Sequence, residues 1–358
     1  MNSASTQPVS SNVAVLRTAV VGLGRIGFGH HVPAVLAHPG YALAAVVDPV
    51  AERRAEATAK WGAPAFADVA EMSRAVRPDL VVVASPTRFH AEHTLAALHA
   101  GAHVFCDKPV ATDLAEFDRM TAAAGEGRRF LAYQPYRLSA QVRSLRAVLD
   151  QGLIGRVHEI RRSREGYVRR ADWQAFHQHG GGLLNNYASH HFDEFLALMP
   201  GREIARVFCH VQRVASLGDA EDVVKATVVA DDGCVFHLDT SQASALPGQS
   251  WLVHGAHGSA RWDEAEQGWF VRHFDPAAAP SVAASRELAA AGRSYGGETL
   301  PWRETRVSAA RYPEINYYEA AHAHFTRGAE PPVGVAGSRA LLALIERCRL
   351  SAEQGVVA

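Results

Sequence analysis

The stretch "VVGLGRIG", residues 20–27, decides the fold of this chain. It runs from an apolar segment into three glycines, Gly22, Gly24 and Gly27, in the spacing G-x-G-x-x-G. In this arrangement the first glycine permits a tight turn, the second lets the backbone approach a pyrophosphate, and the third lets a helix pack closely on the strand. The first N–H groups of that helix also attract a phosphate. The stretch therefore predicts a strand, a phosphate-binding turn and a helix.

The chain has 29 glycines, so their spacing alone is weak evidence for a dinucleotide-binding turn. Asp48 supplies independent support. It ends the apolar segment "YALAAVVD", 21 residues after Gly27, where an acidic residue meets the ribose hydroxyls of a dinucleotide. Its charge repels a 2′-phosphate, so we expect NAD. NADP stays possible because Arg53 and Arg54 follow closely. The alternative is an aspartate that only caps a strand.

The pattern around the glycines indicates a parallel sheet. Short apolar segments, such as "DLVVVASP" and "HVFCDKP", alternate with alanine-rich segments of helical period up to "RFLAYQPY". Strands that are apolar on both faces belong in a parallel sheet covered by helices. We expect a disordered tail over residues 1–14 and a doubly wound Rossmann domain over residues 15–134.

The pattern changes after about residue 150, where strands follow one another with hairpin signals. Residues 221–244 contain two alternating strands around Asp231, Asp232 and Gly233, and residues 250–275 repeat the pattern at later glycines. Helices are expected at 182–199, around 313–327 and at 336–353, with a long loop over 275–312. Residues 135–358 are thus predicted to form an α/β domain on a mostly antiparallel open sheet that binds substrate.

The composition excludes several classes of function. The 358 residues include 36 basic and 37 acidic side chains, so there is no overall positive charge to neutralise nucleic-acid phosphates. The basic run "RRSREGYVRR", residues 161–170, is interpreted as a solvated strand face. No apolar stretch is long enough to span a membrane, and the N-terminus has no export signal. Four scattered cysteines without a CxxC pair suit a cytoplasmic protein without disulfides.

Lys108 is the first candidate for catalysis. In an open parallel sheet the ligand crevice lies beyond the carboxyl ends of the strands, which is where "VVVASP" and "VFCDKP" end. A lysine at this edge can stabilise the oxygen of a carbon that gives or receives a hydride. The alternative is a surface lysine at a strand end.

The predicted helix after Gly182 supplies a second candidate. Asn186, His190 and Glu194 recur at i, i+4 on a narrow polar face, beside an apolar stripe that includes Tyr187. His190 could exchange a hydroxyl proton and Asn186 could orient a substrate oxygen, although a lone helical histidine is usually structural. The paired histidines of the chain have no HExxH spacing, and no metal is expected.

Taken in order, these motifs resemble the Gfo/Idh/MocA family of glucose-fructose oxidoreductases, inositol dehydrogenases and rhizopine-catabolism proteins. The resemblance rests on "VVGLGRIG", "VVDPVAERR", "DKP", "GGGLLNNYASHHFD" and "VHGAHGSARWD". It implies a sugar or cyclitol dehydrogenase in which Lys108 and His190 flank the reacting carbon, and a homo-oligomer, a dimer or tetramer, formed through the C-terminal sheet. Two residues depart from the family pattern: Asp107 replaces the usual Glu, and Asn186 stands where many members carry Asp.

The candidate site has three groups of residues. Those expected to be catalytic are Lys108, His190 and Asn186. Those expected to hold the cofactor are Gly22, Gly24, Arg25, Ile26, Gly27, Asp48, Ser85, Pro86, His90, Asp107 and Lys108. Those expected to bind substrate are Tyr136, Arg137, Tyr167, Trp173, Asn186 and His190.

Two other functions fit the same motifs. One is an NAD-dependent glycosidase or epimerase-like enzyme that oxidises its substrate transiently and recycles the bound cofactor. The other is a redox-sensing NAD(P)-binding regulator that uses the second domain for protein contacts. A regulator has no need of both Lys108 and His190, so the two residues favour an enzyme.

Overall fold

The computed structural model describes residues 14–125, 129–286 and 297–358. Most of the predicted tail, residues 1–13, lies outside the described residues, as does 287–296 of the predicted loop. The chain forms two compact units. The first holds the residues up to Tyr133 together with Asn316–Arg339, and the second holds Gln134–Ile315 and Ala340–Ala358.

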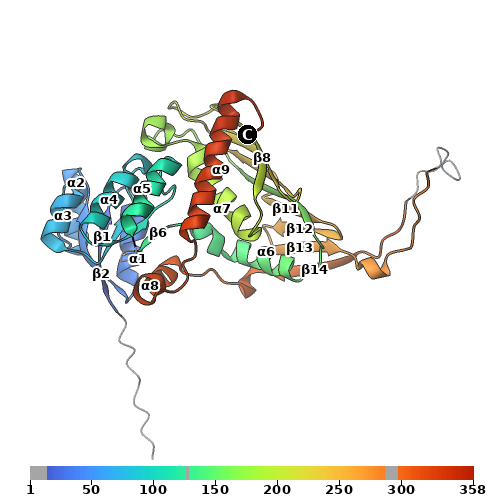
Figure 1. Cartoon of the computed structure of the whole chain (residues 1–358), viewed down its shortest axis with the longest axis horizontal. Helices are drawn as coiled ribbons and strands as arrows, with labels where there is room; N and C mark the ends of the chain where they lie inside the picture. The colour runs from blue at the N-terminus through green and yellow to red at the C-terminus, as the bar shows by residue number, and fades with distance from the viewer. Residues whose placement is uncertain (1–13, 126–128, 287–296) are drawn as a thin grey trace, which may run out of the picture. The chain divides into compact units, whose positions relative to one another are not determined.

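The first unit is built on a six-stranded parallel sheet in the order β3-β2-β1-β4-β5-β6 (Figure 1). Its strands are β1 (Leu16–Val21), β2 (Tyr41–Val47), β3 (Ala65–Phe66), β4 (Leu80–Val83), β5 (His103–Cys106) and β6 (Phe130–Ala132). Its helical segments include η1 (Gly27–His31), α1 (Val32–Ala37), α2 (Ala51–Trp61), α3 (Val69–Val76), η2 (Thr87–Phe89), α4 (His90–His99), α5 (Leu114–Ala124) and α8 (Tyr317–Arg327). The strand order reverses beside β1, which makes the predicted doubly wound Rossmann sheet and confirms that part of the fold.

The register of the central strands positions the ligand edge. Val21, the last residue of β1, pairs with Val47 on β2 and with Val83 on β4, and Val83 in turn pairs with Cys106 on β5. The four strands therefore end at one level. All residues of β4 are buried, as expected for a strand covered on both faces. Asp48 and Asp107 follow the ends of β2 and β5 directly, and Ser85 is the second residue after β4.

Helix α8 belongs to the first unit, although its position after residue 135 predicts a place in the second domain. Aromatic packing holds it there, because the ring of Tyr317 stacks on Phe105 of β5 with centroids 5.7 Å apart. Arg129 also donates hydrogen bonds to the carbonyl oxygens of His324 and Phe325 at the end of the helix. Because these contacts join residues about 200 positions apart, the local sequence pattern of α8 does not indicate which unit the helix belongs to.

The second unit is built on an eight-stranded sheet in the order β14-β13-β12-β11-β7-β10-β9-β8. Its strands are β7 (Val157–Glu165), β8 (Ile204–Gln212), β9 (Val223–Ala230), β10 (Val235–Ser241), β11 (Trp251–Gly255), β12 (Gly258–Asp263), β13 (Gly268–His273) and β14 (Arg303–Ser308). Only β7 and β10 pair in parallel among these neighbours; the others are antiparallel. The predicted mostly antiparallel sheet and both predicted hairpin groups are confirmed.

Helices cover one face of this second sheet (Figure 1). They are α6 (Ala140–Asp150), the π-helical segment η6 (Leu184–Ala188) with α7 (Ser189–Leu198), and α9 (Val335–Gln354). The core between sheet and helices contains Leu145 of α6, Phe192 of α7 and Ile345 of α9, together with Phe236 of the sheet. The predicted helices after Gly182 and after residue 335 are confirmed.

The sequence pattern missed several elements and one loop assignment was wrong. Residues 303–308, predicted as part of a loop, form edge strand β14 and pair with β13. The short elements β3 and α3 and the helix α6 were not predicted. Helix α6 does carry a readable signal, because Ser139 caps it by accepting from the Val142 N–H, and Val142, Leu145 and Val148 are buried at helical spacing.

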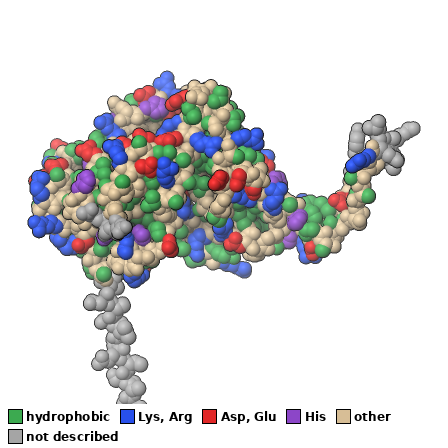
Figure 2. All heavy atoms as spheres, viewed as in Figure 1, with side chains coloured by type: hydrophobic (Ala, Val, Ile, Leu, Met, Phe, Trp, Pro, Cys, Tyr) green, Lys and Arg blue, Asp and Glu red, His purple; other side chains and the backbone are tan. Residues whose placement is uncertain are grey.

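The hydropathy of the helices and the distribution of charged side chains bear on the predictions made from composition. No helix among them is long and apolar enough to cross a membrane. Figure 2 shows basic and acidic side chains interspersed over the face in view, in keeping with a formal net charge of -1.

Candidate active site

The glycine turn in the first unit has the geometry of a phosphate cradle. Gly22 has φ +92°, and a Cβ on it would lie 2.6 Å from the backbone N of Ser85. A Cβ on Gly27 would lie 1.7 Å from the carbonyl oxygen of Gly22. A Cβ on Gly24, in contrast, would meet nothing within 4 Å. Packing thus explains two of the glycines, whereas Gly24 leaves bare backbone facing open space.

The helix that follows the turn begins at Arg25 and Ile26 and continues as the π-helical segment η1. Its first N–H groups therefore lie directly after the bare backbone of Gly24. Short π-helical segments are rare in proteins, and those that do occur are often found at functional sites. The residues present fit the phosphates of a dinucleotide: glycine backbone, a helix start, and no acidic residue in the first turn of η1.

Asp48 braces this cradle from the end of β2. The side chain is almost fully buried, with Oδ2 accepting from the Leu23 N–H at 2.8 Å and Oδ1 from the Val50 N–H at 2.9 Å. Arg53 lies 3.5 Å from Oδ2, and Arg54 donates to the Asp48 carbonyl. A carboxylate accepts about four hydrogen bonds, so capacity remains for ribose hydroxyls.

Asp107 and Lys108 stand at the carboxyl end of β5. The Asp107 N–H donates to the Val83 carbonyl at the end of β4, and Asp107 Oδ1 accepts from the Lys108 N–H at 2.8 Å. Burial raises the pKa of Asp107, but its interactions with His31 and Lys108 outweigh burial and the pKa is lowered. The carboxylate is therefore charged and fixes the backbone of Lys108, whose side chain is half-buried.

His90, expected from the sequence to hold the cofactor, is buried between the ends of two strands. It is 1% exposed, with Nε2 2.7 Å from the Ser85 carbonyl oxygen and Nδ1 2.8 Å from that of Pro109. Burial lowers the pKa of His90. The ring braces the ends of β4 and β5. Pro86 directly precedes the short helix η2, and Ser85 Oγ lies 2.9 Å from Nδ1 of His93.

His190 and Tyr136 come together in the second unit. Tyr136 belongs to η3 (Pro135–Leu138), and its ring stacks on His190 with centroids 3.9 Å apart and an interplanar angle of 12°. His190 is largely buried, at 6% exposure, on the first turn of α7. Burial raises the pKa of Tyr136, with Arg164 opposing this. The stack orients the imidazole.

Asn186 lies on the π-helical segment just before His190. Its Nδ2 donates to Oε1 of Gln174 at 3.0 Å, and Arg170 donates to the same oxygen. Gln174 is in η4 (Trp173–Ala175), which follows the basic run. Gln174 thus orients Asn186, a role that its sequence position does not signal. Tyr167, at 60% exposure, lies two residues after the end of β7, and Trp173, at 38% exposure, is the first residue of η4.

Glu194, expected on the same polar face as His190, is buried instead. Its Oε2 accepts from Arg162 Nε at 3.0 Å and lies 2.9 Å from Nδ1 of His191. Burial raises the pKa of Glu194, but Arg162 and His191 outweigh it and the pKa is lowered. Burial, reinforced by Arg162, lowers the pKa of His191 to about 4. Helix α7 is thereby tied to β7 through a buried charged group.

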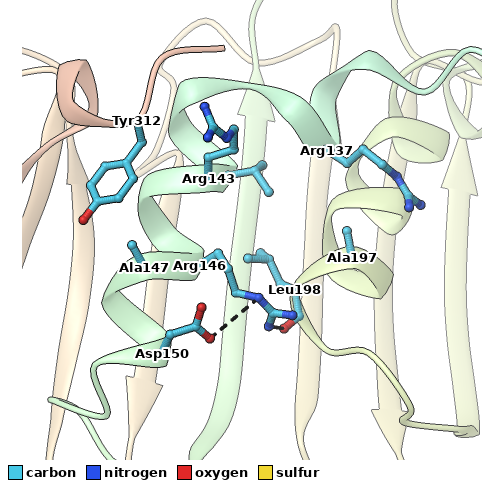
Figure 3. Close-up of a pocket in the computed structure, with 9 residues that line it drawn as sticks. Arg137, Arg143, Arg146, Ala147, Asp150, Ala197, Leu198 and Tyr312 are labelled. Carbon is cyan, nitrogen blue, oxygen red and sulfur yellow. Dashed lines mark hydrogen bonds and ion pairs between the residues drawn. The ribbon is translucent and has the colours of Figure 1, made fainter. Parts of the chain in front are cut away.

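Arg137, predicted to bind substrate, donates from Nε and Nη2 to the two carboxylate oxygens of buried Asp193. It borders a cavity of about 300 Å³ between α6 and α7. Figure 3 shows Arg137 directed away from Arg143 and Arg146, which line the same cavity. Arg137 thus positions α7 next to the candidate site.

Lys108 belongs to the first unit and His190 to the second. Within the described parts of the chain, no group of three His, Cys, Asp or Glu side chains is arranged to hold a metal ion.

Family models match both parts of the chain. The NAD-binding Rossmann-fold model of the GFO/IDH/MocA oxidoreductase family matches residues 16–134, and the model of the family's C-terminal domain matches residues 142–261. These matches confirm the resemblance seen in the sequence.

Individual proteins agree with the models. D-glucoside 3-dehydrogenase of Escherichia coli (strain K12) is 28% identical over 254 residues, 66% of this chain and 72% of the relative. Myo-inositol 2-dehydrogenase of Thermotoga maritima is 30% identical over 235 residues, 63% of this chain and 69% of the relative. The crystal structure of an NAD-binding protein from Listeria innocua has a TM-score of 0.83 at 21% identity, covering 96% of this chain and 99% of that one. This last likeness supports the fold.

Proposed function

This chain belongs to the GFO/IDH/MocA family of NAD-binding oxidoreductases, and from that membership we propose that it oxidises a secondary hydroxyl of a sugar, sugar derivative or cyclitol, or reduces the corresponding ketone. The relatives named as dehydrogenases of a glucoside and of myo-inositol support this substrate class. NAD, when bound, supplies the nicotinamide carbon that accepts or returns the hydride.

The bare backbone at Gly24 carries the proposal. A Cβ there would meet no described atom within 4 Å beyond its chain neighbours, so packing does not require glycine at this position. A pyrophosphate approaching the backbone does require it. Gly22, Gly24, the helix start at Arg25 and the buried Asp48 would together hold the cofactor, with His90 bracing the strand ends behind them.

Three side chains divide the work on the substrate. Lys108 donates a hydrogen bond to the reacting oxygen and stabilises negative charge that develops on it. His190 takes the hydroxyl proton during oxidation and returns it during reduction. Asn186 orients a neighbouring substrate oxygen. Asp107 and Tyr136 are positioning residues, because one fixes the backbone of Lys108 and the other stacks on His190.

Asp48 favours NAD over NADP. A 2′-phosphate would be placed next to a buried carboxylate that already accepts two backbone hydrogen bonds. Arg54, which could compensate, donates to the carbonyl oxygens of Asp48 and Pro49.

The test is a panel of sugars and cyclitols incubated with the purified full-length chain and NAD, followed at the absorbance band of reduced nicotinamide. We expect turnover with at least one compound and a loss of about 100-fold or more in kcat for Lys108→Ala and His190→Ala. Lys60→Ala, on the exposed end of α2, is the matched control and keeps full activity.

Two results would contradict the proposal. If no member of the panel is oxidised while NAD copurifies with the chain, the cofactor is recycled internally and the enzyme belongs to the glycosidase or epimerase-like class. If the chain binds NAD and the two alanine variants behave as wild type in every assay, the side chains have no catalytic role.

A further inference from the structure

The basic run of residues 161–170 contains five arginines with different surroundings. Three of them have carboxylate partners within 4 Å: Arg161 with Glu159, Arg162 with Glu194, and Arg170 with Asp172. A solvated strand face, as the sequence pattern predicts, describes the exposed Arg161 and Arg164 but not Arg162, which is buried.

Arg164 lies on the inner face of the second unit's sheet. Side chains alternate along a strand, so Ile160, Arg162 and Arg164 of β7 point to the same side. Ile160 is in the core beneath the helices, and Arg162 reaches Glu194 on α7. Arg164, two residues further on, is exposed and lies where this covered face opens at the carboxyl end of β7.

The guanidinium of Arg164 stacks on an aromatic ring beside the candidate site. Its Cζ lies 4.7 Å from the ring centroid of Tyr187, which is on the same π-helical segment as Asn186. Arg164 also acts electrostatically on Tyr136, the residue stacked on His190, and on His191. Stacking holds the plane of a guanidinium while leaving its N–H edge available.

No carboxylate neutralises Arg164 within the described residues. The side chain has no ion pair or hydrogen bond in those parts of the chain, and only its backbone carbonyl accepts one, from Thr240. Glu194 is bound by Arg162 and His191, and Glu165, on the opposite face of β7, accepts from the Gly248 N–H. Arg164 is thus an oriented cation whose N–H groups bind none of the residues that the structure describes.

We propose that the substrate of this site carries an oxyanion, a carboxylate or a phosphate, that Arg164 binds. A guanidinium presents paired N–H groups that match both groups in bidentate geometry. The anionic group would be bound next to His190 and Asn186, so the substrate class is an acidic or phosphorylated sugar or cyclitol in place of a neutral one. This inference rests on the proposed function, because it concerns the same site.

Isothermal titration calorimetry of the full-length chain with saturating NAD tests the inference without requiring turnover. The probes are glucose and galactose, each as the neutral sugar, the uronate and the 6-phosphate, at low salt. We expect one anionic form to bind at least about tenfold more tightly than its neutral parent. Arg164→Gln weakens that anion by about 10- to 100-fold and leaves the neutral sugar unchanged. The preferred anion identifies carboxylate or phosphate.

Arg161→Gln is the matched control, because it removes one positive charge from the opposite face of the same strand and keeps wild-type binding. The inference is overturned if neutral sugars bind as tightly as both anions, if none of the probes binds, or if Arg164→Gln weakens neutral and anionic probes equally. Anion binding without NADH formation would retain the inference and count against the proposed function. NADH formation from neutral sugars, with no preference for the anionic forms, would support the proposed function and overturn the inference about Arg164.

Discussion

The ring of Tyr136 lies flat against the imidazole of His190, with centroids 3.9 Å apart and planes inclined by 12°. Residues 54 positions apart in the chain are thereby held in one geometry. Tyr136 comes from the short helix η3, and His190 from the first turn of α7. The stack explains how a largely buried histidine keeps one orientation, which the proton transfer proposed for His190 would require.

Replacing Tyr136 tests this relationship. Tyr136→Phe keeps the ring and should retain activity within about twofold, whereas Tyr136→Leu should lower kcat by about 2- to 10-fold, because an aromatic pair contributes about 0.5–1.5 kcal/mol. The measurement is kcat and KM separately on a substrate found in the panel. An effect on KM alone, with kcat unchanged, would assign Tyr136 to substrate contact.

The glycines of the cradle should separate cofactor binding from folding. Gly24→Ala meets no protein atom, so its thermal midpoint should stay the same or rise slightly, while affinity for NAD falls by about tenfold or more because the methyl group occupies the phosphate approach. Gly27→Ala should lower the thermal midpoint, since its Cβ would lie 1.7 Å from the Gly22 oxygen. Wild-type NAD affinity in Gly24→Ala would refute the phosphate-binding role.

Cofactor preference should depend on Asp48. Asp48→Asn removes the negative charge and keeps an acceptor for one of the two backbone N–H groups, so the ratio of kcat/KM for NADP to that for NAD should rise by about tenfold. Glu52→Gln, which removes an exposed charge from the start of α2, is the control and leaves the ratio unchanged. An unchanged ratio in Asp48→Asn would show that other groups set the preference.

Stability should fall in acid because of His191 and Glu194. The pKa of buried His191 is lowered to about 4 in the folded chain. In the unfolded chain this histidine takes up a proton near pH 6.5, whereas in the folded chain it stays neutral until about pH 4. The free energy of unfolding therefore declines as the pH falls from about 6.5 to 4. The lowered pKa of Glu194 adds a further loss below its unfolded value near 4.5. For His191 the loss is on the order of 3 kcal/mol.

Thermal unfolding at several pH values measures this loss. The wild-type midpoint should drop between pH 6.5 and 4, and His191→Gln should show a smaller drop over the same range. His210→Gln changes an exposed histidine on β8 and should reproduce the wild-type drop. Equal pH dependence in wild type and His191→Gln would mean that other groups control acid stability.

Much of the fold could be predicted because its signals are local. The glycine turn, the doubly apolar strands and the hairpins around Gly233 and Gly258 are each recorded within a few residues, and all were found in the structure. Strand β14 was missed because an edge strand with four of its six residues exposed lacks a clear period. Helix α3 is only 8 residues long, which is too short for its period to be distinctive.

The sequence by itself determined the dinucleotide-binding turn, the class of both sheets and the family, because these depend on spacing along the chain. Only the tertiary structure decided which polar residues are committed to one another. It paired Arg137 with Asp193 and Arg162 with Glu194, buried His90 between two carbonyls, and left the guanidinium of Arg164 stacked on Tyr187. Five arginines in one short run look alike as letters, and they differ because strand alternation and helix packing place each beside different charges.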